Sequence, residues 1–211
     1  VDTGQPGVDL GIGRLGLIDR RLKLRHLEDR FSGTYRSTNF DMMEAVYLPS
    51  GKRDDPRRRF LRGLLIRLSV PMPFDGTTII TARGDGVAPA RITSFFRRKR
   101  LKKVPFDDPV FELHYQATSD NADEARRLVA PVLRNALLAM SNERQGEIVR
   151  AAFHKGDFWI SVPVWRPLFE IATLMTPPRQ LEERSLRAAD EITVAHRIID
   201  QLHGSGPKRL I

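Results

Sequence analysis

The sequence lacks cysteine and has no long hydrophobic run. With no cysteine among 211 residues, the chain can form no disulfide, thiolate nucleophile or cysteine-ligated metal site. The longest apolar stretch, GLLIRLSVPMPF from Gly63, contains an arginine and two prolines. It falls short of the roughly 20 apolar residues that cross a bilayer. The sequence therefore predicts no transmembrane helix, and its first residues show no signal-peptide pattern.

Recognisable catalytic motifs are also missing, because GxSxG, HExxH and P-loop sequences do not occur. The stretch GIGRLG, Gly11 to Gly16, matches GxGxxG, but no strand pattern precedes it and no parallel-sheet pattern follows. Asp107 and Asp108 could pair as acid and base, yet turn chemistry before Pro109 explains them. We therefore predict no catalytic residue and no cofactor-binding residue.

One histidine-rich pattern resembles a metal site. His196, Asp200 and His203 are spaced to share one face of a terminal helix, and such spacing can hold a metal. No further histidine or cysteine ligand is indicated nearby, and the same residues fit the polar flank of an amphipathic helix. We predict that they do not bind a metal.

Positive charge is concentrated in the first half of the chain. The net charge is +9, and residues 1–103 hold 22 Lys and Arg against 11 Asp and Glu. Residues 104–206 hold 11 against 15. This asymmetry indicates that one face of the protein meets an anionic partner.

Apolar residues make up 41% of the chain, which is enough for a packed core. Short runs rich in aromatic and β-branched residues between residues 31 and 82 predict antiparallel strands with a break near Asn39. The mixed period of residues 13–31 fits either a short helix or a strand. Residues 109–117, PVFELHYQA, alternate as a strand would. Phe111, Leu113 and Tyr115 are then expected to face the core.

The second half gives clearer signals. Asp120 or Asn121 can cap a helix that buries Leu128 and Leu137, and Pro131 should kink or split this helix. A hairpin follows over residues 147–162, and a final helix is predicted for residues 179–203. Its inner stripe is expected to comprise Leu181, Ser185, Ala188, Ile192, Ala195, Ile199 and Leu202.

Together these patterns predict an α+β fold: an antiparallel, strand-rich N-terminal half followed by strand, helix, β-hairpin and terminal helix. We expect one domain over residues 18–203. Residues 1–17 should form a flexible tail, and residues 204–211 a C-terminal tail.

Four stretches carry a resemblance to a known family: FSGTYRSTNFDMMEAVYL, FLRGLLIRLSVPMPFDGTTII, FDDPVFELHYQATSDNADEARRLVAP and AAFHKGDFWISV. With them the chain resembles the bacterial family known as domain of unknown function 3137, from about Phe31 to Leu202. Members of that family typically carry hydrophobic segments upstream. The resemblance thus implies a membrane-anchored protein facing the cytoplasm, at the inner membrane, with the anchor outside this sequence. It carries over no catalytic residue.

The candidate site is the run FFRRKRLKK, which has six cations in the seven residues from Arg97 to Lys103. Like charges so close together repel one another, so we expect an exposed loop. It should contact an anionic membrane surface or a membrane-protein partner, with a second basic loop on the same face. The predicted contact residues are Arg57, Arg58, Arg59, Arg97, Arg98, Lys99, Arg100, Lys102 and Lys103.

The basic run also allows three alternative interpretations. Cytoplasmic segments beside membrane spans gather Lys and Arg through the positive-inside bias alone, without any binding role. The charge also suits nucleic acid, although no recognition module accompanies it. An enzyme with an unrecognised site is the third. We favour a non-enzymatic accessory or interaction domain.

Overall fold

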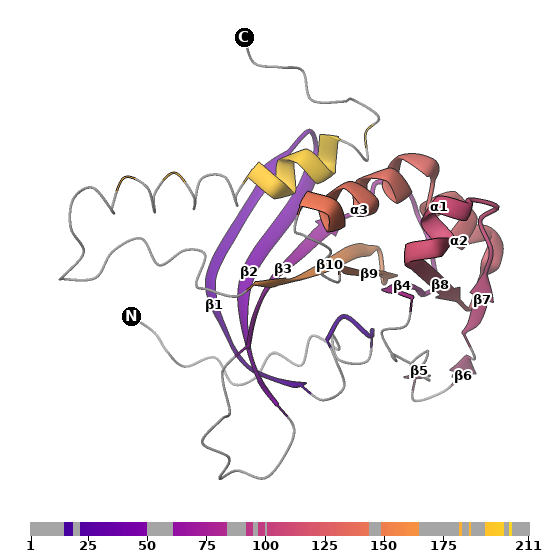
Figure 1. The fold of residues 1–211 in the computed structure, drawn as a ribbon, viewed down its shortest axis with the longest axis horizontal. Coiled ribbons are helices and arrows are strands. Elements are labelled where there is room, and N and C mark those ends of the chain that lie inside the picture. The colour runs from indigo at the N-terminus through magenta and orange to yellow at the C-terminus, as the bar shows by residue number, and fades with distance from the viewer. Residues whose placement is uncertain are drawn as a thin grey trace.

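Two long strands, β1 (Leu22–Tyr35) and β2 (Thr38–Pro49), begin the fold of the computed structural model (Figure 1). The structure describes residues 15–18, 22–49, 61–83, 92–94, 97–99, 101–143, 149–164 and 193–200, and positions 182, 186 and 203. The segment that fitted either a helix or a strand is thus a strand from Leu22 onward.

The turn between β1 and β2 lies earlier than expected. Arg36 and Ser37 form it with positive φ values of 47° and 61°, whereas the sequence pattern placed the break near Asn39. Pairing runs from Tyr35↔Thr38 to Leu22↔Pro49. The polar letters STN contain several turn formers, so composition alone did not locate the turn within them.

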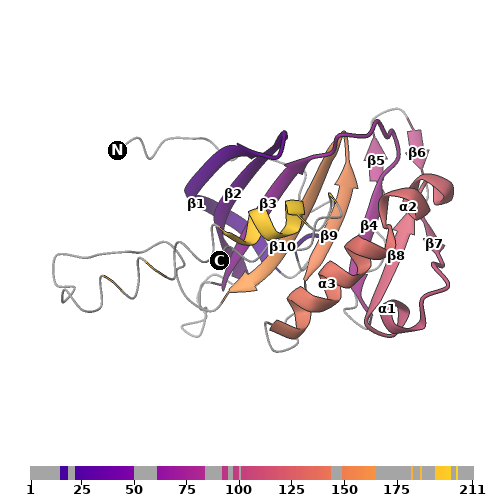
Figure 2. The same ribbon diagram turned by 90° about the horizontal axis from the view of Figure 1, so that it is seen from above.

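The strands form one eight-stranded sheet in the order β1-β2-β3-β10-β9-β4-β8-β7, and all neighbouring strands in it are antiparallel. A separate pair is formed by β5 and β6. The late β9–β10 hairpin lies between β3 and β4, so it joins the two parts of the sheet (Figure 2). The remaining strands are β3 (Leu61–Ser69), β4 (Thr78–Ala82), β5 (Ile92–Ser94), β6 (Arg97–Lys99), β7 (Lys102–Val104), β8 (Tyr115–Ser119), β9 (Arg150–His154) and β10 (Asp157–Val164).

The predicted C-terminal hairpin is confirmed. His154 pairs with Asp157 across a two-residue turn, in which Lys155 and Gly156 have φ values of 51° and 82°. Such turns require positive φ at both central positions, which glycine adopts without strain.

Helices α2 (Ala122–Leu128) and α3 (Pro131–Glu143) confirm the helix prediction, including the split at Pro131. Asn121 is the N-cap of α2, since its side-chain oxygen accepts a 3.2 Å hydrogen bond from the Glu124 backbone N–H. Pro131 opens α3, where a missing N–H is tolerated. A C-terminal helix covers residues 193–200.

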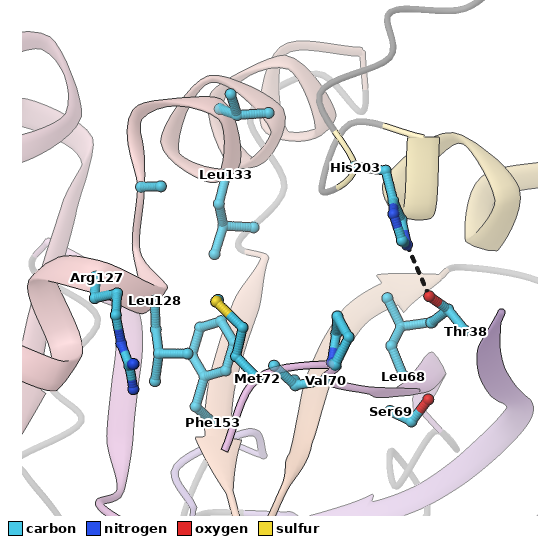
Figure 3. A pocket seen from close by; sticks show the side chains of 13 residues that line it. Thr38, Leu68, Ser69, Val70, Met72, Arg127, Leu128, Leu133, Phe153 and His203 are labelled. Carbon is cyan, nitrogen blue, oxygen red and sulfur yellow. Dashed lines mark hydrogen bonds between the residues drawn. The ribbon is translucent and has the colours of Figure 1, made fainter. Parts of the chain in front are cut away.

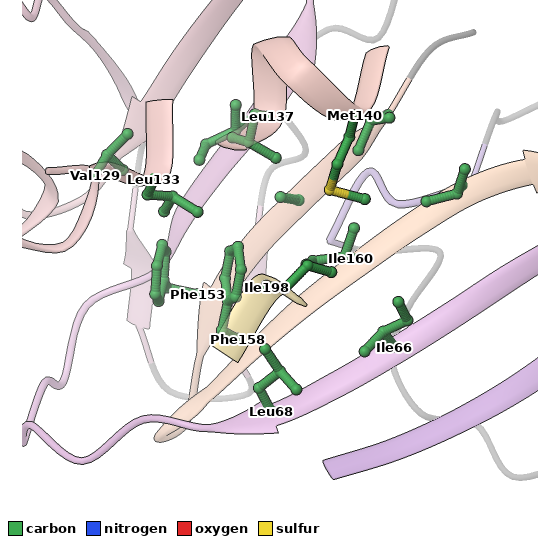
Figure 4. Packing of buried hydrophobic residues seen from close by; sticks show 14 of the residues in the cluster. Ile66, Leu68, Val129, Leu133, Leu137, Met140, Phe153, Phe158, Ile160 and Ile198 are labelled. Atoms are coloured by element: carbon green, nitrogen blue, oxygen red, sulfur yellow. The ribbon is translucent and has the colours of Figure 1, made fainter. Parts of the chain in front are cut away.

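These helices cover one face of the sheet and enclose the main core (Figure 4). Phe153 and Phe158 stack with ring centroids 4.3 Å apart. The predicted burial of Leu128 and Leu137 is confirmed, as is that of Ala195 and Ile199. The other predicted stripe residues of the last helix lie outside the described residues: Leu181, Ser185, Ala188, Ile192 and Leu202.

A second hydrophobic cluster lies on the opposite face. It includes Tyr47, Leu65 and Trp159 from the sheet and Leu17 from the described part of the N-terminal segment. The ring of Tyr47 packs directly over Gly63, where an added Cβ would come within 2.9 Å of a ring carbon. Burial raises the pKa of Tyr47 to about 12. Both faces of the central strands are therefore buried.

The predicted strand over residues 109–117 is wrong in its first part. Pro109–His114 is a helix, α1, and only β8 continues as a strand. Leu113 is 65% exposed, whereas Phe111 and Tyr115 are buried. Residues four positions apart, such as Phe111 and Tyr115, share a face both in a helix and in a strand. Only the exposure of Leu113 therefore distinguishes a helix from a strand here. The missed signal was Asp108-Pro109, an N-cap followed by proline at the first helical position.

Candidate functional site: a basic sheet edge

The basic run from Arg97 to Lys103, called the basic edge below, is partly strand, and its last part lies at the end of the eight-stranded sheet. Residues 97–99 form β6, which pairs with β5, and Lys102–Val104 form β7, the last strand in the sheet order. The expectation of a loop is therefore wrong for these residues. Like charges disfavour a packed interior, but they do not disfavour an edge strand whose side chains reach solvent.

Leu101 anchors the run from within. It is only 7% exposed and belongs to the cluster on the second face of the sheet. Lys102 and Lys103, which follow it, are exposed, and Val104 is buried. The two lysines are thus held between apolar anchors, with their side chains in solvent.

Backbone pairing fixes the position of the two lysines. Lys102 lies opposite Ser119 and Lys103 opposite Thr118 on β8. On the partner strand, Ser119 accepts a 3.0 Å hydrogen bond from the Thr78 hydroxyl of β4. The lysine backbone therefore belongs to the sheet, while the side chains are exposed.

The turn after β7 is closed by a second set of contacts. The Phe106 backbone N–H donates to Glu112 at 2.7 Å, and the Arg134 guanidinium lies 5.5 Å from the centre of the Phe106 ring. Asp108 caps α1 by accepting from the Phe111 N–H at 3.1 Å and also pairs with Arg134 at 2.7 Å. Both contacts, the backbone hydrogen bond first, hold the pKa of Asp108 below its usual value.

Asp108 is therefore committed to α1 and α3 rather than to the basic edge. No carboxylate in the described part of the chain forms an ion pair with Lys102 or Lys103. Among the described residues, both lysine side chains therefore lie in solvent without an acidic partner.

The other predicted contact residues are described less fully. Arg97, Arg98 and Lys99 have defined backbone positions in β6, opposite Ser94, Thr93 and Ile92. Arg57, Arg58, Arg59 and Arg100 lie outside the described residues. The basic run thus contributes strands to two different sheets, β6 to the small pair and β7 to the eight-stranded sheet, and the second basic loop stays a prediction.

The histidine pattern of the last helix has a structural role. The His196 ring stacks on Tyr35, with centroids 4.3 Å apart, and Asp200 pairs with Arg36 at 3.0 Å. His203 Nε2 lies 2.9 Å from the Thr38 hydroxyl. Each side chain attaches the helix to the β1–β2 hairpin. In the described ranges, no three histidine or acidic side chains gather as a metal site would require.

Sequence reasoning missed two features: the burial of Leu101 within the basic run, and the contacts of the last helix with the β1–β2 hairpin. A single leucine inside a basic run carries no periodicity, so nothing distinguished Leu101 from an exposed residue. The partners of the last helix, Tyr35, Arg36 and Thr38, lie more than 150 positions away in the sequence, and only the fold brings them near it.

Among the described helices, none is long and apolar enough to span a membrane.

This architecture defines an α+β domain whose antiparallel sheet ends in a lysine-bearing strand. The chain belongs to the DUF3137 family of proteins of unknown function, whose model matches residues 59–203. Three of the four stretches that carried the resemblance lie inside this range. The first, residues 31–48, precedes it.

Comparison with solved structures found the crystal structure of the mycobacterial trehalose monomycolate transport factor A, TtfA. It is 14% identical, with a TM-score of 0.36, over 82% of this chain and 73% of that chain. A likeness this slight carries no argument about function. No curated protein matches the sequence.

Proposed function

We propose that this chain is a non-enzymatic interaction domain that docks on anionic lipid at the cytoplasmic face of a bacterial inner membrane. The observation that carries the proposal is the exposure of Lys102 and Lys103 on the last strand of the sheet, beside an anchored run of further cations. Because the backbone of β7 pairs with β8, the two lysines hold defined positions along the edge strand, one on each face.

The expected free energy of binding is of the size that gives reversible attachment to a membrane. Near an acidic leaflet each cation contributes on the order of 1 kcal/mol. The six cations from Arg97 to Lys103 can therefore hold the domain at a surface without insertion.

Lysine on an edge strand also has a second physical role, which is to discourage pairing with the edge of another molecule. That role needs exposure but no lipid. The two roles differ in their response to anionic vesicles and to salt, because only docking depends on an external surface and is screened by ions.

Vesicle sedimentation tests the proposal. The protein should sediment with vesicles that contain phosphatidylserine or phosphatidylglycerol, release as salt rises, and ignore neutral vesicles. Replacing Lys102 and Lys103 by Ser should reduce partitioning about 30-fold, the equivalent of about 2 kcal/mol.

The matched control replaces two other exposed cations, Arg83 and Lys155, by Ser. It should bind nearly as well as the wild type, because net charge falls equally while the basic edge stays intact. Equal loss in both variants would contradict the proposal, and preference for duplex DNA over vesicles at physiological salt would favour nucleic-acid binding instead.

A further inference from the structure

A pocket of about 130 Å³ opens on the helix-covered side of the sheet, and none of the predicted basic contact residues lines it (Figure 3). Leu68 and Phe153 line it from the sheet, and Leu128 and Leu133 line it from α2 and α3. All four side chains are buried. The inner surface is therefore apolar.

The pocket is open to solvent on one side. Met72 and Val132 both line it and are 42% and 43% exposed, so they lie where it meets water. Apolar surface that is exposed beside a hollow is typical of ligand-binding grooves. Their position beside an apolar hollow indicates a ligand with an apolar end.

Cationic and polar groups border the same opening. Arg127 and His203 line the pocket from opposite sides (Figure 3). The Arg127 guanidinium donates to the Pro73 carbonyl at 3.0 Å, which fixes its position. No carboxylate among the described residues pairs with it, since Asp123 pairs with Arg126 and Glu124 accepts from the Asp75 and Gly76 N–H groups.

We propose that this pocket binds a short anionic amphiphile, a free aliphatic carboxylate whose chain fills the apolar hollow and whose carboxylate pairs with Arg127. Charge complementarity selects the head, because a positioned guanidinium offers two parallel donors to a carboxylate. Volume selects the chain, since an apolar cavity of roughly 150 Å³ holds one benzene, and this pocket therefore holds about five carbon atoms.

Binding of straight-chain carboxylates, followed by backbone NMR shifts at Leu128, Val132 and Leu133, tests the site. Affinity should rise from butanoate to hexanoate and then level off, because longer chains extend into water. Hexanol should bind more weakly than hexanoate. Failure of hexanoate to shift these resonances at millimolar concentration would overturn the proposal, as would equal binding of hexanol.

Two neighbouring arginines provide a matched pair. Arg127→Gln should weaken hexanoate binding at least tenfold and leave hexanol unchanged. Arg126→Gln, one residue away on α2 and outside the pocket lining, should behave as the wild type. Equal effects of the two substitutions on hexanoate would contradict the role of Arg127.

Filling the apolar hollow with a larger side chain tests separately whether it holds the aliphatic chain of the ligand. Ala130→Phe places a ring in the hollow from a position before Pro131, where an extended backbone accepts any side chain. It should abolish binding of both hexanoate and hexanol. Val132→Trp, from the solvent side of α3, repeats the test if the first variant does not fold, and retained binding in a folded filled variant would overturn the proposal.

This site is independent of the basic edge. The variant without Lys102 and Lys103 should bind hexanoate as the wild type does. Conversely, Arg127→Gln should sediment normally with anionic vesicles. The two proposals therefore fail separately.

Discussion

The two edge strands of the sheet, β1 and β7, are protected in different ways against pairing with another chain. β1 is 14 residues long and has pairing irregularities between Leu24 and His26 and between Glu28 and Arg30. β7 has three residues, two of which are lysines. An unpaired edge invites association with another chain, and bulges, short length and lysine all prevent it.

The difference lies in how each edge uses its charges. On β1 two charged side chains form ion pairs within the protein: Arg30 pairs with Asp41 at 2.8 Å, and Glu28 pairs with Arg62 at 2.5 Å. On β7 the described residues supply no ion-pair partner for either lysine. Charge on the first edge stabilises the fold, whereas the two lysines of the second edge lie in solvent.

The largest effect should come from breaking the ion cluster behind β1. Arg62 pairs with Glu28 and also with Glu44, whose side chain is only 1% exposed. Arg62→Gln should lower the free energy of unfolding by about 3 kcal/mol, because a buried carboxylate loses its guanidinium. Urea unfolding measures this. The control Arg30→Gln, at a side chain that is 61% exposed, should cost less than about 1 kcal/mol.

A smaller loss is expected when the β7 anchor is shortened. Leu101→Ala should lower the free energy of unfolding by about 2 kcal/mol, since it removes buried methyl groups and leaves a cavity. Leu113→Ala, at the exposed leucine of α1, should change it by less than about 0.5 kcal/mol. The reverse order would mean that the basic run is not anchored and that α1 is wrongly placed.

The β1 edge should also respond to acid. Burial raises the pKa of Asp41, but hydrogen bonds from Ser32 and Arg30 outweigh it and hold that pKa below its usual value. Its contribution is therefore complete above the unfolded pKa and is lost as the pH falls through the lower folded pKa. Asp41→Asn should cost about 1 kcal/mol at neutral pH, and this difference should vanish at low pH. A difference that is independent of pH would show that the carboxylate charge is not involved.

The smallest effect on stability is expected at the lysines themselves. Replacing Lys102 and Lys103 by Ser should change the free energy of unfolding by less than about 0.5 kcal/mol. Size-exclusion chromatography should give the elution volume of the wild type. Larger species would show that the lysines mainly prevent edge-to-edge pairing.

Local sequence signals predicted the elements that depend on local chemistry. Asn121 acts through a side-chain hydrogen bond to the next turn, and Pro131 and Gly156 act through their own backbones. The capped helix, its split and the hairpin were therefore recognisable from the residues alone. The strand predicted from alternation was wrong for residues 109–114. A helix and a strand both bury Phe111 and Tyr115, so only the exposure of Leu113 separates the two structures. The order of the strands was not predictable, since inserting β9–β10 between β3 and β4 depends on contacts between distant segments.

The sequence predicted the cationic residues of the candidate site but not their secondary structure. Six cations in seven residues are visible in the sequence, but their division between β6 and β7 depends on Leu101 and on pairing with β8. The pocket was invisible for the same reason, because Leu68, Leu128 and Phe153 resemble ordinary core residues until the fold brings them together.

Vesicle sedimentation with matched charge removal tests the central claim most directly. One variant replaces Arg97, Arg98, Arg100 and Lys102 by Ser, and the other replaces Arg30, Arg83, Arg126 and Lys155, four exposed cations elsewhere. We expect the first to lose binding to anionic vesicles and the second to retain most of it, with wild-type binding abolished by salt. Equal sedimentation of both variants would contradict docking through the basic edge.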